Sequence, residues 1–185
     1  DVLSDAKVPV EIVGLGGLIR LPEVAQVVAT LGLLDDLTDN AALLTLLTGP
    51  RWEIGVRDLA LLGRRAGELI GSQGRDEAQR SLVEQLQESV AGADPTEVAS
   101  LVEALDNPGD LPYSPQARAR FAALAAELRH LRGFTGEPLL DLLRRIMDVI
   151  GLDIELASST SEAAAARRDN LDLFVKAVAE FQAVD

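Results

Sequence analysis

The sequence predicts an all-α domain with one short strand near its N-terminal end. Across most of the 185 residues, Leu, Val, Ile and Ala recur at the three- and four-residue spacing of a buried helix face. Gly and Pro interrupt this pattern where helices are expected to begin and end. Residues 8–13, Val-Pro-Val-Glu-Ile-Val, instead have the β-branched content and alternation of a strand. A chain of this length can form a sizeable core without disulfides or metals.

The expected helices follow one another with recognisable start and stop signals. Pro22 suits a first helical position, where its missing N–H has no partner to lose. Ser114 followed by Pro115 marks another start, and Gly71 and Gly151 mark two ends. The elements predicted in this way are helices at about residues 22–34, 40–47, 58–70, 94–105, 115–132, 138–150 and 162–183, a polar segment at 75–91 and a short apolar element at 152–157.

The predicted strand is followed by Gly14, Gly16 and Gly17, which resembles the start of a dinucleotide-binding pattern. Ile19 stands where the third glycine of that pattern belongs, and no second strand follows. We therefore expect a close-packed turn here. Because one strand cannot be stable alone, the partners of residues 8–13 are expected in another part of a longer protein.

Composition excludes several classes of protein. The chain has no Cys, which rules out a disulfide framework and a thiolate zinc site and fits a reducing cytoplasm. Its net charge of −13 argues against a broad nucleic-acid-binding face. The charge is uneven, since residues 51–80 carry six basic and five acidic side chains, whereas residues 81–110 carry seven acidic and no basic ones. No apolar run reaches the roughly 20 residues of a membrane span, so we expect a cytoplasmic protein with no membrane partner.

The usual signs of catalysis are missing from the sequence. His130 lies beside Arg129 in a predicted helix and is interpreted as a surface or packing residue. Acidic pairs such as Asp35 and Asp36 lack the His or spaced carboxylates of a metal site. There is no Gly-x-x-x-x-Gly-Lys-Ser/Thr loop for nucleotide hydrolysis. We therefore expect this chain to hold no catalytic residue, metal or cofactor, and not to be an enzyme by itself.

The stretch that most suggests binding is residues 48–59. Arg51 and Arg57 bracket Gly55, and a helix is predicted to begin directly afterwards. A tight turn followed by free amides at a helix start can hold a phosphate. An ordinary helix–helix connector, with Trp52 in the core and Arg51 in solvent, explains the same residues and is favoured by the local chemistry alone.

Three segments carry a family pattern, in order along the chain. They are residues 8–24, with Val-Pro-Val-Glu-Ile-Val-Gly-Leu-Gly-Gly and Pro-Glu-Val; residues 39–55, ending in Pro-Arg-Trp-Glu-Ile-Gly; and residues 167–171, Arg-Arg-Asp-Asn-Leu. Together they resemble the first strand and helix, the Asn-x-Pro-x-Arg-Gly-Ile-Gly turn and the Arg-x-x-Asn-Leu signature of the 2B subdomain of UvrD/Rep/PcrA-type superfamily 1A DNA helicases. The actinobacterial AdnA/AdnB-like branch is the most similar in character.

The resemblance implies that residues 1–185 are a single 2B subdomain, excised at junctions 1–20 and 165–185 from a helicase motor. Residues 72–111 have little counterpart in the family pattern and are expected to be a lineage-specific insertion. The parent would be an ATP-dependent helicase or translocase that moves 3′ to 5′ in DNA repair or recombination. ATP and Mg would bind its motor subdomains, outside this chain. The implied partners are duplex DNA, those motor subdomains and a second helicase–nuclease subunit.

By the same resemblance, the Gly-Ile-Gly turn contacts the backbone of duplex DNA without reading its sequence and helps to regulate unwinding. The expected DNA-backbone contacts are Arg51, Ile54, Gly55, Val56 and Arg57. The expected structural supports are Trp52, Arg167 and Asn170.

One departure from the pattern keeps other functions open. Glu53 replaces the first glycine of the turn and places a negative side chain where a phosphate would approach. Together with the net charge, Glu53 favours an alternative in which the domain is a protein-interaction or autoinhibitory part of the helicase with no DNA contact. A stand-alone helical regulatory domain is a third possibility, and the sequence that flanks this chain in its gene distinguishes it from the other two.

Overall fold

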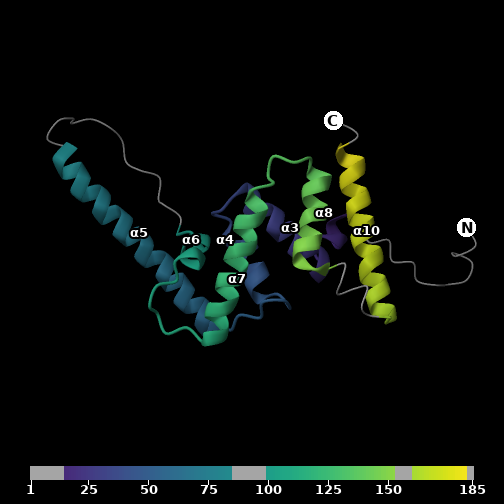
Figure 1. The fold of residues 1–185 in the computed structure, drawn as a ribbon, viewed down its shortest axis with the longest axis horizontal. Helices are drawn as coiled ribbons and strands as arrows, with labels where there is room; N and C mark the ends of the chain where they lie inside the picture. Colours follow the sequence, from purple (N-terminus) through teal and green to yellow (C-terminus); the bar gives the residue numbers. More distant parts are fainter. Residues whose placement is uncertain (1–14, 85–98, 153–159, 183–185) are drawn as a thin grey trace, which may run out of the picture. The chain divides into compact units, whose positions relative to one another are not determined.

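The computed structural model describes residues 15–84, 99–152 and 160–182, and every regular element within them is an α-helix (Figure 1). The all-α prediction is thus confirmed, whereas the strand predicted at residues 8–13 lies outside the described ranges. The chain divides into two compact units. One comprises residues 29–136, and the other comprises the described parts of 1–28 and 137–185.

The unit of residues 29–136 is built around a short central helix. Its elements are the second half of α3 (Pro22–Asp35), α4 (Asn40–Thr48), α5 (Val56–Glu84), α6 (Leu101–Asp106) and α7 (Pro115–Arg132). α6 lies against α4, α5 and α7. Side-chain caps fix two of the helix starts: an Asp39 carboxylate oxygen accepts from Ala42 N at 2.9 Å, and Ser114 Oγ accepts from Ala117 N at 3.1 Å.

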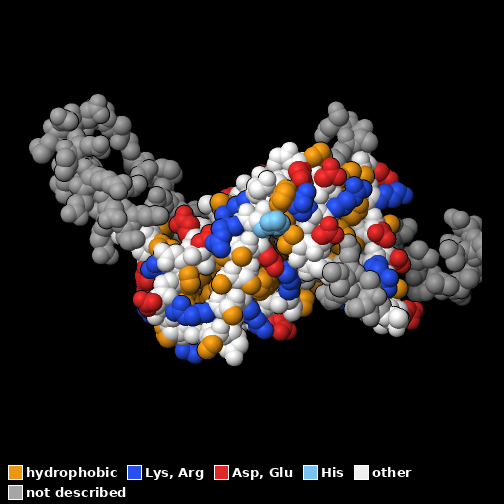
Figure 2. All heavy atoms as spheres, viewed as in Figure 1, with side chains coloured by type: hydrophobic (Ala, Val, Ile, Leu, Met, Phe, Trp, Pro, Cys, Tyr) orange, Lys and Arg blue, Asp and Glu red, His pale blue; other side chains and the backbone are white. Residues whose placement is uncertain are grey.

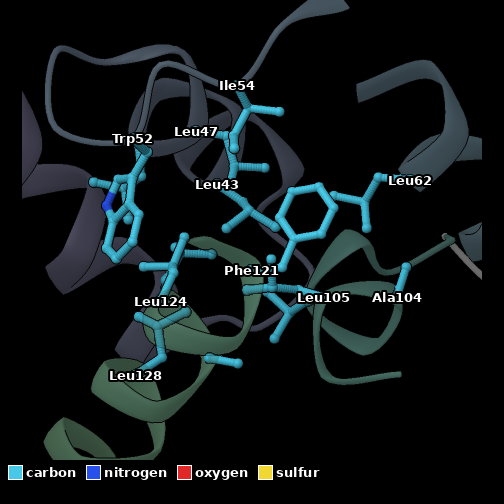
Figure 3. Packing of buried hydrophobic residues seen from close by; sticks show 14 of the residues in the cluster. Leu43, Leu47, Trp52, Ile54, Leu62, Ala104, Leu105, Phe121, Leu124 and Leu128 are labelled. Carbon is cyan, nitrogen blue, oxygen red and sulfur yellow. The ribbon is translucent and has the colours of Figure 1, made fainter. Parts of the chain in front are cut away.

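A single hydrophobic cluster fills this unit (Figure 3). Phe121 of α7 is fully buried at its centre, and the Tyr113 ring packs edge-on against it with ring centroids 5.3 Å apart. Burial of each such side chain contributes about 1.5–3 kcal/mol relative to exposure. Other fully buried members are Leu33, Leu43, Leu47, Leu62, Leu105 and Leu128.

The other unit contains α2 (Leu15–Leu18), the first half of α3, α8 (Leu139–Ile150) and α10 (Glu162–Gln182). Both α2 and α8 lie against α10. Gly151 ends α8 with a left-handed φ of 74°, a conformation that favours glycine and that the sequence pattern predicts. The buried face of α8 consists of Leu142, Leu143, Ile146 and Met147.

Several local predictions need correction. The helix expected to end at Gly71 continues to Glu84, because one glycine inside a helix costs only about 1 kcal/mol relative to alanine. The helix expected over 94–105 is not continuous, since Ala99 and Ser100 are non-helical and Ser100 caps α6. Residues 15–18, expected to form a turn, form one helical turn instead.

Part of the stretch expected to be an insertion, residues 72–111, is integral to the core. Its residues 101–106 form α6, which contacts three other helices. Val102, Ala104 and Leu105 of α6 are buried in the hydrophobic cluster. Removal of this stretch would therefore open the core of the unit.

Candidate nucleic-acid interface

The turn between α4 and α5 is closed by its own backbone hydrogen bonds. Trp52 N and Glu53 N both donate to the Gly49 carbonyl, at 3.2 and 2.9 Å, and Ile54 N donates to the Leu47 carbonyl at 2.8 Å. These three amides are therefore used within the fold. The amides of the first turn of α5, beginning at Val56, have no acceptor inside the helix and are the ones that can meet an anion.

Glu53 occupies a backbone conformation that suits glycine. Its φ is 42°, and it is the one non-glycine residue with a positive φ in the described part of the chain. The left-handed region costs an L-residue roughly 1–2 kcal/mol because Cβ approaches the following carbonyl. Glycine would adopt this backbone conformation without that cost.

Two side chains of the turn point inward. Trp52 and Ile54 are 7% and 6% exposed and belong to the hydrophobic cluster. Figure 3 shows the Trp52 indole beside Leu124 of α7, and Ile54 near Leu47 of α4. Ile54, an expected DNA contact, thus has its side chain in the core and its N–H bonded to Leu47. Its observed contacts hold the turn against α4.

Arg51 folds back onto the protein. Its guanidinium forms a two-pronged ion pair with the Glu127 carboxylate of α7, with Nη1 2.7 Å from Oε2 and Nη2 bonded to Oε1. It also lies over the Trp52 ring, 4.8 Å from the ring centroid. The Arg51 side chain is 30% exposed, so solvent reaches part of it.

Gly55, Val56 and Arg57 form the exposed part of the turn. Val56 is 83% exposed, and a Cβ added at Gly55 would meet no atom within 4 Å. Arg57 is exposed and donates from Nη2 to the Pro112 carbonyl at 3.2 Å. Three of the five predicted DNA-backbone contacts therefore lie together at the surface, at the start of α5.

Asp58 joins the N-terminal ends of α5 and α7, which lie side by side (Figure 1). Asp58 is 8% exposed, and its carboxylate accepts from Ser114 N and from Ser114 Oγ, both at 2.8 Å. Ser114 in turn caps α7. Two helix ends that carry positive partial charge are thereby held together. Local sequence patterns did not reveal this pairing, because the two residues are 56 positions apart.

Two arginines in the first two turns of α7, which sequence reasoning missed, bind loops close to these helix starts. Arg120 Nη1 donates to the carbonyls of Trp52 and Glu53, at 2.6 and 3.0 Å. Arg118 donates to the carbonyls of Gly109 and Leu111, at 3.0 and 2.6 Å. A carbonyl oxygen satisfies a guanidinium donor without cancelling its charge, so Arg118 and Arg120 stay electrically uncompensated by these contacts.

The surface around these helix ends is locally basic. Residues 51–71 and 112–132 together carry eight arginines and four acidic side chains, in a chain whose net charge is −13. Figure 2 shows Lys and Arg side chains on the surface near the starts of α5 and α7. We call the surface formed by Gly55, Val56, Arg57, Arg118 and Arg120 the α5–α7 surface.

The other predicted support residues form a polar cluster in the second unit. The Glu23 side chain at the start of α3 is 4% exposed. It accepts from Asn170 Nδ2 at 3.1 Å and lies 3.6 Å from Arg167 Nε, both on α10. A buried carboxylate is stable only when paired and hydrogen-bonded, so these contacts fasten α3 to α10. They join the first and third segments of the helicase-like pattern.

Other polar features suggest no chemistry. His130 is exposed and contacts the Phe134 ring edge-on, with centroids 5.1 Å apart. An open hollow of about 530 Å³ beside the start of α8 is lined by charges that pair with each other. There Arg145 bonds Glu137 at 2.7 and 3.1 Å, which raises the pKa of Arg145. Within the described ranges, no three His, Cys, Asp or Glu side chains are grouped to hold a metal.

No described helix combines the length and apolar character needed to cross a membrane. A scan of the chain against protein-family models and a search of curated proteins give no match. The resemblance to helicase 2B subdomains therefore depends on the residues quoted for it.

Proposed function

We propose that this chain is a 2B-like accessory subdomain of an ATP-dependent 3′ to 5′ DNA helicase of the cytoplasm, and that it contacts the backbone of duplex DNA through the α5–α7 surface. One observation carries the proposal: two helix N-termini are joined by Asp58 and Ser114, and Arg57, Arg118 and Arg120 lie in the first two turns of these helices and bind neutral backbone carbonyls. In this role ATP and Mg would bind the motor subdomains, and this chain would position DNA.

The chemistry of the surface suits phosphate more than bases. Helix-start amides and guanidinium groups bind phosphate oxygens in any sequence. The exposed apolar side chain of Val56 can rest against deoxyribose. With about three uncompensated arginines, the logarithm of affinity should fall with the logarithm of salt concentration at a slope of roughly −2.7 or shallower.

The test is a titration of a fluorescein-labelled duplex of mixed sequence, followed by anisotropy over a range of salt concentrations. Arg57→Ala removes one exposed charge from the α5–α7 surface and should weaken binding and reduce the salt slope by about one. The matched control is Arg144→Ala, which removes an exposed charge from α8. Equal effects of the two variants, or binding insensitive to salt, would refute the proposed surface.

The alternative, a protein-interaction or autoinhibitory domain without DNA contact, is favoured by one specific pair. Arg51, the basic neighbour of the turn in the helicase pattern, is held by Glu127 rather than left free. If the alternative is correct, neither the unmodified protein nor any single charge variant will bind duplex, even at low salt. A nucleotide-binding loop in the flanking sequence of the parent gene would fit both of these functions and exclude a stand-alone domain.

A further inference from the structure

Arg51 differs from the arginines of the α5–α7 surface in its partner. Arg57, Arg118 and Arg120 donate to neutral backbone carbonyls. Arg51 donates to a carboxylate, through two parallel hydrogen bonds. Its charge is therefore cancelled locally, although it lies within three residues of Ile54 and at the same turn.

α7 holds this turn at two points on one helix face. Arg120 binds the carbonyls of Trp52 and Glu53, and Glu127, seven residues later, binds the Arg51 guanidinium. Residues seven apart face the same side of a helix after about two turns. The first attachment fixes the backbone of the turn, so it keeps the turn in place when the second is released.

We propose that Glu127 is an intramolecular competitor that occupies Arg51 until a DNA phosphate displaces it. This inference rests on the proposed DNA contact. A phosphodiester and a carboxylate bind a guanidinium through the same two-pronged geometry, so both cannot use the same edge of Arg51 at once. The pair is reached by solvent, with side chains 30% and 24% exposed, so a phosphate can approach it.

Glu127 should lower the affinity for duplex DNA only modestly, because the Arg51–Glu127 ion pair is partly exposed. Exposed and half-exposed ion pairs contribute little to stability and are screened by salt. Neutralising Glu127 should therefore raise duplex affinity roughly two- to fivefold, and it should steepen the salt slope by about one as Arg51 joins the contact.

The core of the experiment is an anisotropy titration of the unmodified chain, Glu127→Gln, Arg51→Ala and the double variant that carries both changes, with two further variants measured in the same way. Glu127→Gln keeps the shape of the side chain and removes only its charge. The matched control is Glu103→Gln, which removes an exposed charge from α6 in the same unit. Circular dichroism and the emission of Trp52, the single tryptophan, check that each variant is folded, and Glu127→Ala serves as a second neutral variant.

The expected result is a gain with both neutral Glu127 variants, no comparable gain with Glu103→Gln, and loss of the gain when Arg51 is also replaced. If the unmodified chain binds duplex but Glu127→Gln binds no better than Glu103→Gln, the competition is refuted and the proposed function stands. If none of the proteins binds duplex at the lowest salt, the proposed function fails and the competition fails with it.

Discussion

Replacement of Glu53 by glycine should both stabilise the unit of residues 29–136 and strengthen its binding to duplex DNA. The backbone at Glu53 has a φ of 42°, which costs an L-residue roughly 1–2 kcal/mol. Glycine removes that cost but adds about 0.5–1 kcal/mol of chain entropy to the unfolded state. The net expectation is a gain of about 0.5–1 kcal/mol in the free energy of unfolding.

The side chain of Glu53 contributes nothing that would be lost. It is exposed, and the contacts recorded at this residue use its backbone: the N–H donates to Gly49 and the carbonyl accepts from Arg120. Urea unfolding followed by Trp52 emission measures this unit directly, because Trp52 lies in its core. The extrapolated free energy of unfolding should rise while its dependence on urea concentration stays constant.

The control that separates strain from charge is Glu53→Ala. Alanine keeps the Cβ and so keeps the backbone strain, but it removes the carboxylate. Stability should therefore rise with glycine and not with alanine, whereas duplex affinity should rise about two- to threefold with both, because a negative charge leaves the approach of a phosphate. An alanine variant as stable as the glycine variant would refute the strain argument.

Two further predictions concern the scaffold, each measured by the same urea titration. Asp58→Ala should cost about 1–2 kcal/mol, because it leaves two partly buried Ser114 donors without their acceptor. Ser114→Ala should cost about 1 kcal/mol more than an exposed alanine substitution, because it removes the cap of α7. A loss under 0.5 kcal/mol for Asp58→Ala would contradict the pairing of the two helix ends. Gly109→Ala should destabilise the unit by about 1–2 kcal/mol, because φ is 64° there and the new Cβ would lie 3.1 Å from Arg65 Nε. Gly63→Ala, in an open helical position, should instead stabilise it by up to about 1 kcal/mol. The same sign of change in stability for both substitutions would contradict this reasoning.

The helix boundaries that the sequence predicts well are those set by local signals. Asp39 caps α4, Ser114 with Pro115 begins α7, and Gly151 ends α8, and each acts within one turn of the chain. The failed boundary at residues 94–105 has a distant cause. Asn40 donates to the Ala99 carbonyl at 2.7 Å and accepts from Leu101 N at 2.9 Å, so it holds Ala99 and Ser100 in a non-helical conformation where helix was expected. No pattern near residue 99 reveals a partner 59 positions away.

The candidate site also has features that local sequence signals reveal and features that depend on distant partners. The sequence identifies the 48–59 stretch, its arginines and its apolar tryptophan, because these are properties of residue type and order. It does not show that Arg51 turns toward Glu127, 76 positions later, or that Arg120 grips the turn. Both facts depend on the packing of α7 against the turn. The positive φ at Glu53 is not indicated by its residue type, since glutamate rarely adopts it.

The net charge of −13 does not decide whether DNA can be bound, because charges act over a limited distance. At physiological salt the screening length is about 8 Å, so a phosphate at the α5–α7 surface responds mainly to nearby groups. Arg57, Arg118, Arg120 and the two helix ends attract it, and the carboxylates of Glu53 and Asp58 oppose them. At low salt the screening length grows to roughly 30 Å near 0.01 M, and the acidic remainder of the chain then repels the duplex as well. As salt is removed, the attraction by the arginines and the repulsion by the acidic residues both grow, and they oppose each other. The affinity should therefore level off at low salt instead of rising along a straight line, and the arginine variants should differ most in the intermediate range.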